Sequence, residues 1–152
     1  MRHLAPRGAW TAASPAGRRL GSSLGLKHRR TDDWIRELQR GLPFATLKTF
    51  ATVTRWPLTQ IASALGIPER TLARRRAAGR LAPDESERLF RLSRIFERAV
   101  DLFEGDSSAA TAWLSTPRQA LSDQAPLAYA RTELGAREVE NLIGRLEHGV
   151  FS

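Results

Sequence analysis

The sequence of 152 residues contains no cysteine, and none of its apolar runs reaches the roughly 18 to 20 residues that a helix needs to cross a bilayer. Without cysteine, the chain cannot form a disulfide, a thiolate zinc site or a thiol nucleophile. Both absences suit a soluble protein in a reducing compartment. We therefore expect a cytoplasmic protein without a membrane partner.

Histidine is scarce as well, and its three copies are scattered. His3 and His28 fall within the first thirty residues, while His148 has no second ligand at metal-site spacing. Glu138 and Glu140 lie two positions apart, so on a helix their carboxyl groups do not face one another. The sequence offers no catalytic constellation, and we predict a protein that is not an enzyme and uses no metal and no cofactor.

Acidic residues are missing from the first thirty positions, which hold seven lysines and arginines. Residues 1 to 82 carry sixteen basic and four acidic residues, a net charge of +12, whereas residues 83 to 152 carry eight basic and twelve acidic residues, a net charge of −4. A basic region favours a polyanion, usually nucleic acid, because binding releases condensed counterions. Biased codon usage would also enrich arginine, so charge alone leaves the partner open.

Residues 1 to 30 combine Gly, Ser, Ala, Pro and Arg without an apolar period, which predicts a flexible basic arm. Beyond it, apolar residues recur at helical spacing and no strand pattern or internal repeat competes, so we predict an all-α fold. The charge split divides it into a domain over 31–82 and a second domain over 83–152. A first helix is expected from a cap at Thr31 or Asp32 to Gly41, and a second from about 44 to 54.

The most regular pattern predicts a long helix from Ser86 to Phe103, within the range 84–104. Its apolar positions recur at intervals of three and four residues: Leu89, Leu92, Phe96, Ala99, Val100 and Phe103. Phe90 and Ile95 widen this stripe beyond one face of the helix. The helix is therefore expected either to lie between two layers of its own chain or to form a dimer interface.

The remaining residues predict shorter helices. One contains Trp113, another starts at Pro117, and a helical turn opens at Pro126. Gly135 is expected to break the helical pattern before a last helix, and Gly149 is expected to end that helix. The apolar stripe of that last helix consists of Val139, Leu142, Ile143 and Leu146.

The segment from Leu58 to Arg76 has the pattern of a helix-turn-helix. In that motif two helices cross closely, so the contact needs a small residue and the turn needs one that tolerates positive φ. Ala62 and Gly66 meet these requirements. The apolar residues expected to face inward are Ile61, Leu65, Ile67 and Leu72. Arg75 occupies a place that is normally apolar, and we expect Leu81 to fill it; a plain helical hairpin with a solvated arginine face is the alternative.

Arginine dominates the second helix of this motif, which would lie in the major groove of DNA. The residues expected at base edges lie in its early turns: Arg70, Thr71 and Arg74. The residues expected at phosphates are Thr59, Gln60, Arg75, Arg76 and Arg80. Because one motif recognises only a half-site, we expect a homodimer on operator DNA, with the long apolar stripe as its candidate interface.

Residues at characteristic spacing continue beyond the motif: Thr71-Leu72, Arg74-Arg75, Gly79-Arg80-Leu81, Glu85-Ser86, Arg88-Leu89, Arg91-Leu92, Phe103, Ala112-Trp113-Leu114, Pro117, Ala120-Leu121, Pro126-Leu127, Thr132, Gly135, Val139, Leu142, Arg145-Leu146 and Gly149-Val150-Phe151-Ser152. With them, the segment from Leu58 to Ser152 resembles antitoxins of the Xre/MbcA/ParS class, notably the Xre partners of RES-domain toxins. That family usually has a glycine pair where this chain has Ser122-Asp123, which predicts a differently shaped loop before Pro126.

The resemblance implies a type II antitoxin that binds operator DNA through an Xre-like helix-turn-helix and binds a cognate RES-type toxin, which degrades NAD, through its helical C-terminal domain. Two alternatives remain open. One is a one-component transcription regulator without a toxin partner, whose second domain senses a ligand or only dimerises. The other is an adaptor whose basic arm binds nucleic acid without sequence preference.

The sequence closes with two apolar side chains beyond a helix stop, which is unusual for a segment exposed to water. The residues expected to contact the toxin are Arg145, His148, Val150, Phe151 and Ser152. In this interpretation Phe151 fills a toxin pocket, and the Ser152 carboxylate pairs with a toxin arginine. Alternatively, Phe151 folds back against Trp113 or Leu142 of its own domain.

Overall fold

The computed structural model describes residues 20–28 and 30–149 of the chain. These residues form eight α-helices and two short 3-10 helices, with no strand beyond isolated bridges, which confirms the all-α prediction. The helices are α1 (Thr31–Arg40), α2 (Phe44–Thr54), α3 (Leu58–Ala64), α4 (Glu69–Ala78), α5 (Pro83–Leu102), α6 (Ser107–Leu114), α7 (Pro126–Tyr129) and α8 (Glu133–Glu147). The 3-10 helices are η2 (Ser22–Leu24) and η3 (Gln119–Leu121).

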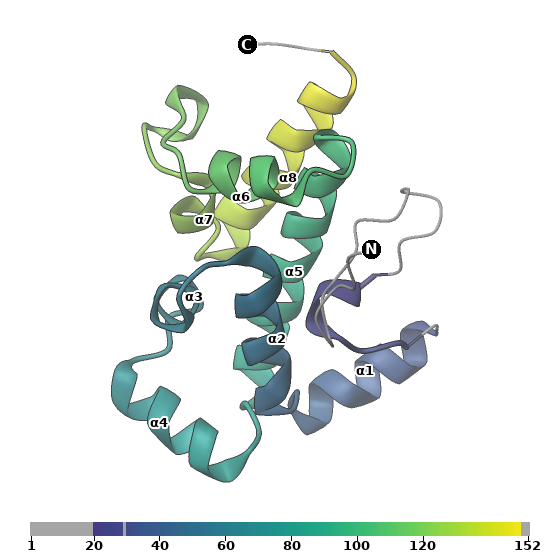
Figure 1. Cartoon of the computed structure of the whole chain (residues 1–152), viewed down its shortest axis with the longest axis vertical. Helices are drawn as coiled ribbons and strands as arrows, with labels where there is room; N and C mark the ends of the chain where they lie inside the picture. Colours follow the sequence, from purple (N-terminus) through teal and green to yellow (C-terminus); the bar gives the residue numbers. More distant parts are fainter. Residues whose placement is uncertain (1–19, 29, 150–152) are drawn as a thin grey trace, which may run out of the picture.

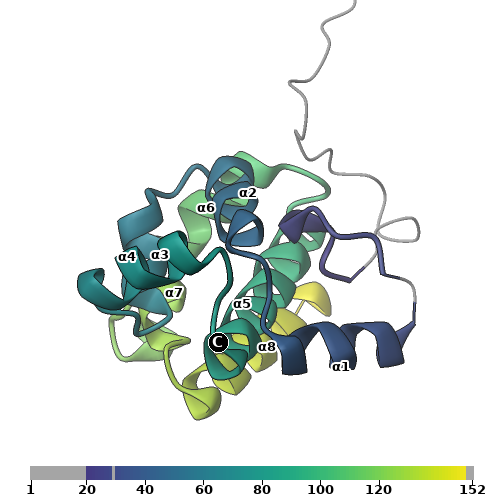
Figure 2. The ribbon, with the colours of Figure 1, turned by 90° about the horizontal axis from the view of Figure 1, so that it is seen from below.

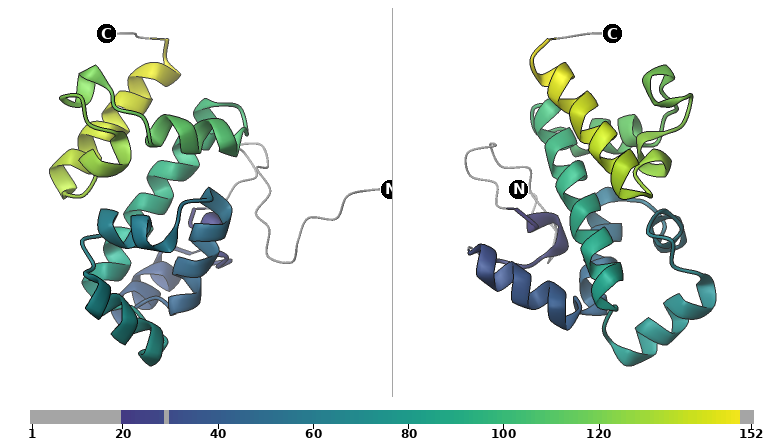
Figure 3. Two further views of the ribbon diagram at one scale, coloured as in Figure 1. Left: turned by 60° about the vertical axis from the view of Figure 1, so that its left-hand side comes forward. Right: turned by 180° about the vertical axis from the view of Figure 1, so that it is seen from behind.

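Helix α5 forms the central axis of the molecule (Figure 1). Helices α1 to α4 surround one half of it, whereas α6, α7 and α8 surround the other, with α8 running alongside α5 (Figure 3). All buried apolar residues belong to one continuous core that extends through both halves. The two halves therefore share α5 and pack as one body.

The apolar stripe of α5 is buried in this core. Leu89, Phe96 and Val100 are fully buried, and Ile95 is 1% exposed. On the widened side, the ring of Phe90 packs against that of Trp34 on α1, with 4.7 Å between the centroids. The helix lies between two layers of its own chain, so the stripe is not the free dimer surface that we considered.

The flexible basic arm that we predicted over residues 1 to 30 is too long at its C-terminal end. Residues 20–28, assigned to the flexible arm, pack against the core: Leu24 is 1% exposed, and its neighbours are held by Glu97 of α5. The buried Glu97 carboxylate accepts hydrogen bonds from the backbone amides of Gly21 (3.1 Å) and Ser23 (3.0 Å), and from the Ser23 hydroxyl. The conformation of this short, glycine-rich segment is therefore held by Glu97, which is distant in the sequence.

The structure also differs from expectation at three places. Helix α1 is preceded by Arg30 rather than capped by Thr31 or Asp32, and the helix expected at Pro117 is only the 3-10 turn η3. Gly135 does not interrupt the chain; it lies in the first turn of α8, where its amide donates to the Thr132 hydroxyl at 3.0 Å. A Cβ at this position would overlap the carbonyl oxygen of Tyr129, so glycine serves close packing of α7 on α8.

Within the part of the chain described by the structure, no helix combines the length and the apolar character needed to cross a membrane.

Candidate functional site

Helices α3 and α4 form the predicted helix-turn-helix. Gly66 in the turn has a φ of +72°, and no atom lies within 4 Å of where its Cβ would be, so backbone conformation rather than space favours glycine here. The amide of Ile67 donates to the carbonyl of Ala62 at 2.8 Å and closes the turn. The inward residues are buried as expected: Ile61, Ala62, Leu65, Ile67, Leu72 and, in the place left by Arg75, Leu81.

The outer face of this motif carries the side chains predicted to meet DNA. Arg70 and Arg74 on α4 are exposed, as are Thr59 and Gln60 at the start of α3. Thr71 is half-buried, and its hydroxyl accepts a long hydrogen bond of 3.4 Å from Arg74. Seen from below, α4 lies at the edge of the molecule, on the opposite side of the view from α1 (Figure 2). Arg70, Arg74, Thr59 and Gln60 are therefore accessible to a large partner.

Arg75 differs from Arg70 and Arg74 because it is paired with an acid of α5. Its guanidinium forms two hydrogen bonds, of 2.8 and 3.2 Å, with the buried carboxylate of Glu85 on α5, and this hydrogen bonding raises the pKa of Arg75. Glu85 also accepts from the amide of Ala82 at 2.8 Å, at the start of α5. Arg75 therefore ties α4 to α5, and its phosphate contact stays a prediction.

Arg76 and Arg80 lie at the far end of α4, where two loops meet. The guanidinium of Arg76 lies over the ring of Phe44, 5.5 Å from its centroid, and Arg80 donates to the carbonyl of Gly41. Gly41 has a φ of +95°, and a Cβ there would overlap the carbonyl oxygen of Leu81. This joint fixes the end of α4 relative to α1 and α2. Arg76 is exposed and Arg80 half-buried, and the phosphate contact of each stays a prediction.

The arginines of α5 have different partners from those of α4. Arg94 pairs with Glu140 and Arg98 with Glu147 on α8, each at 2.9 Å. Arg88 donates to the carbonyl of Leu65 at 2.7 Å and so holds the helix-turn-helix against α5. Burial lowers the pKa of Arg91. This row of charges serves contacts between helices.

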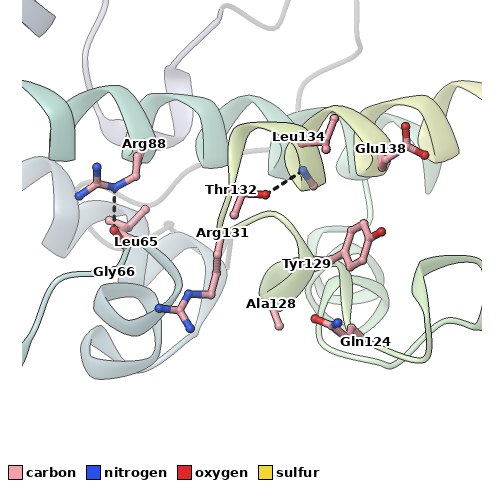
Figure 4. A pocket seen from close by; sticks show the side chains of 11 residues that line it. Leu65, Gly66, Arg88, Gln124, Ala128, Tyr129, Arg131, Thr132, Leu134 and Glu138 are labelled. Carbon is pink, nitrogen blue, oxygen red and sulfur yellow. Dashed lines mark hydrogen bonds between the residues drawn. The ribbon is translucent and has the colours of Figure 1, made fainter.

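Two hollows lie where the helix-turn-helix meets the second half of the chain. The larger, of about 930 Å³, is lined by the turn residues Leu65 and Gly66 and by residues of the segment 124–138, including Tyr129 and the 71% exposed Leu134 (Figure 4). The smaller, of about 400 Å³, lies between α3 and the start of α4. Arg131 borders both hollows, and sequence reasoning did not single it out because no local pattern marks it.

The end of α8 carries the described part of the predicted toxin-binding segment. Arg145 and His148 are exposed, and Nδ1 of His148 lies 2.7 Å from the carbonyl oxygen of Gly144. Gly149 follows with a φ of +73° and ends the helix as expected. The other predicted toxin contacts, Val150, Phe151 and Ser152, lie outside the described residues.

The loop before α7 contains Ser122-Asp123, which stand where the family usually has a glycine pair. Both residues adopt left-handed conformations, with φ of 58° and 62°, which are those that a glycine pair adopts at least cost. The amide of Asp123 donates to the carbonyl of Arg118 at 2.9 Å and closes the loop. The loop thus takes positive φ values at both positions despite having two side chains, and the difference in shape from the family's loop stays a prediction.

Comparison with known proteins places this architecture in a family. The antitoxin Xre-like helix-turn-helix domain matches residues 33–94, and the antitoxin Xre/MbcA/ParS C-terminal toxin-binding domain matches residues 98–149. A Yersinia enterocolitica protein named Antitoxin Xre is 42% identical over 136 residues, which cover 89% of this chain and 92% of that relative. The chain belongs to the Xre antitoxin family.

Two further Xre antitoxins extend this relationship. The protein from Photorhabdus laumondii is 37% identical over 116 residues, covering 76% of this chain and 78% of that relative. The protein from Pseudomonas putida is 33% identical over 107 residues, covering 70% of this chain and 67% of that relative. The resemblance inferred from the sequence is therefore confirmed. The two domain matches meet within α5, the helix shared by both halves.

Proposed function

We propose that this chain is the antitoxin of a type II toxin–antitoxin module, which inhibits a RES-type, NAD-degrading toxin by direct binding and represses its own operon by binding operator DNA. The observation that carries the proposal is that one continuous core joins a helix-turn-helix, whose exposed Arg70 and Arg74 pair with no acid among the described residues, to a domain of the toxin-binding family. A toxin-binding domain favours this function over that of a regulator without a toxin partner. The protein acts in the cytoplasm and without catalysis of its own.

The DNA-binding half acts through α4. Arg70 and Arg74 project from its early turns, where side chains of a recognition helix meet base edges in the major groove. Thr59 and Gln60 contact the phosphate backbone beside it. A single motif covers a half-site, so the protein binds its operator as a homodimer whose two motifs lie about one helical turn of DNA apart. The buried stripe of α5 supplies no part of that dimer interface.

The toxin-binding half acts through the end of α8 and the residues that follow. Arg145 and His148 are exposed there, so a partner protein can reach them without unfolding the domain. Phe151 fills an apolar pocket of the toxin, so the segment closes the toxin's active site. Arg145 meets an acidic residue at the rim of the same interface.

The experiment is co-expression with the toxin encoded beside this gene, followed by measurement of growth and cellular NAD. We expect the full chain to restore both, and a chain lacking Val150 to Ser152, or carrying Phe151→Asp, to restore neither. Thermal melting and operator binding of both variants are measured in parallel and are expected to match the full chain. Restored growth and NAD with the shortened chain would contradict the proposed toxin contact, and a toxin that leaves NAD intact would contradict the RES assignment.

A further inference from the structure

The smaller hollow beside the helix-turn-helix combines residues from both halves of the chain. Eight of its nine lining residues belong to α3, α4 or the turn between them, including Thr59 at the start of α3 and Glu69 at the start of α4. The ninth is Arg131, which lies between α7 and α8 in the toxin-binding domain. The toxin-binding domain therefore places one cation against the DNA-binding motif.

The Arg131 side chain is available for a ligand. It is exposed, and among the residues that the structure describes no acid forms a salt bridge with it. Figure 4 shows its guanidinium extended away from α8 and toward the helix-turn-helix. By contrast Arg137, in the second turn of α8, is paired with Glu133 at 3.2 Å.

The backbone around Arg131 is held firmly in relation to α3 and α4. Its amide donates to the carbonyl of Ala128 at 3.3 Å, and the next residue, Thr132, caps α8. At the end of α3, Arg88 of α5 donates to the carbonyl of Leu65 at 2.7 Å. Because α5 and α8 share the core, the guanidinium stays beside the motif without any rearrangement of the domains.

The position of the hollow indicates what this cation meets. In a helix-turn-helix, the start of the recognition helix enters the major groove while the first helix crosses the sugar–phosphate backbone. A hollow bounded by the starts of both helices therefore faces a phosphate strand when DNA is bound. A guanidinium suits a phosphate because it offers parallel hydrogen bonds as well as charge.

We propose that Arg131 contacts an operator phosphate, so that the toxin-binding domain contributes directly to DNA binding. The inference rests on the proposed role of α4 as the recognition helix. Glu69, the acid that lines the same hollow, opposes the phosphate and limits the affinity. The two residues consequently act on DNA binding with opposite signs.

The test is fluorescence anisotropy of the full chain, without toxin, on a duplex from its own promoter at several salt concentrations. Arg131→Gln is expected to weaken binding about three- to tenfold and to reduce the slope of log affinity against log salt by about 1. Arg131→Lys keeps the charge and is expected to retain most of the slope. Glu69→Gln is expected to tighten binding about two- to fivefold.

The matched control is Arg137→Gln, which removes the same charge from a face of α8 that lines a different hollow, with Arg91 and Arg94. It is expected to leave affinity and slope unchanged, and thermal melting checks that all variants are folded. If Arg131→Gln behaves like Arg137→Gln while Arg74→Ala loses operator binding, the inference fails and the proposed function stands. If neither Arg131→Gln nor Arg74→Ala weakens binding, both fail.

Discussion

Helices α4 and α5 follow one another in the chain, and both are rich in arginine, but they differ in what they bury. Of the ten residues of α4 only Leu72 is buried, whereas ten of the twenty residues of α5 are buried. Half of the side chains of α5 are therefore committed to the core. Most of those of α4 are exposed and open to a partner, while Leu72, the Arg75–Glu85 pair and the contact of Arg76 with Phe44 hold the helix in place.

The arginines of the two helices also differ in whether they are paired with acids. On α5, Arg94 and Arg98 are paired with acids of α8, whereas on α4 the exposed Arg70 and Arg74 have no salt-bridge partner among the described residues. Arginine density alone would have marked both helices as nucleic-acid surfaces. Local pairing, which depends on the packing of distant segments, distinguishes the surface that we propose to bind DNA from the one that joins helices.

The largest effect is expected from a substitution that breaks the packing of α5. Phe96 is fully buried, and its ring packs edge-on against those of Phe50 (5.8 Å between centroids) and Trp56 (6.1 Å). Phe96→Ala should lower the free energy of unfolding by about 3 to 5 kcal/mol, measured by urea denaturation. Arg74→Ala on α4 should change it by less than about 0.5 kcal/mol. Equal losses in the two variants would remove the distinction between the helices.

An intermediate effect is expected at the contact between α5 and the turn of the motif. Arg88→Met keeps most of the apolar stem but removes the donor to the Leu65 carbonyl, and should lower the free energy of unfolding by about 1 to 2 kcal/mol. Operator affinity should fall as well, because the turn between α3 and α4 loses its support. A fully stable variant with normal operator affinity would show that the hydrogen bond does not position the motif.

The smallest effect is expected from the ion pairs between α5 and α8. A double-mutant cycle with Arg94→Ala and Glu140→Ala should give a coupling energy of at most about 1 kcal/mol, because the pair lies near the surface and is screened by salt. The coupling should shrink further at high salt. A coupling that stays large at high salt would mean that the pair behaves as a buried one.

Much of the fold follows from local patterns in the sequence. Helix α2 runs from Phe44 to Thr54 as predicted, and the inward residues of the helix-turn-helix are all buried, because apolar spacing and Gly66 specify them locally. The packing of residues 20–28 did not follow, because Ser23 meets Glu97 across 74 positions of the chain. Gly135 was misassigned for a similar reason: its role depends on the neighbouring Tyr129 carbonyl rather than on its own flexibility.

The candidate site, like the fold, follows only in part from local sequence patterns. Exposure of Arg70 and Arg74 follows from the helical period once Leu72 is assigned to the core. The pairing of Arg75 with Glu85, and the approach of Arg131 to α3, depend on how α5 and the α7–α8 connection pack, which no local pattern encodes. The sequence thus locates the motif, and the tertiary structure determines which of its arginines are free.

The most direct test of this account is to compare Arg74→Ala with Arg94→Ala in one anisotropy titration, on a promoter duplex and on a scrambled duplex at the same salt concentration. The account predicts that Arg74→Ala loses about 1 to 3 kcal/mol of binding free energy on the promoter, and much of its preference over the scrambled duplex. Arg94→Ala should bind both duplexes as the parent protein does, because its partner is Glu140. Equal losses for the two variants, or an unchanged affinity for Arg74→Ala, would contradict it.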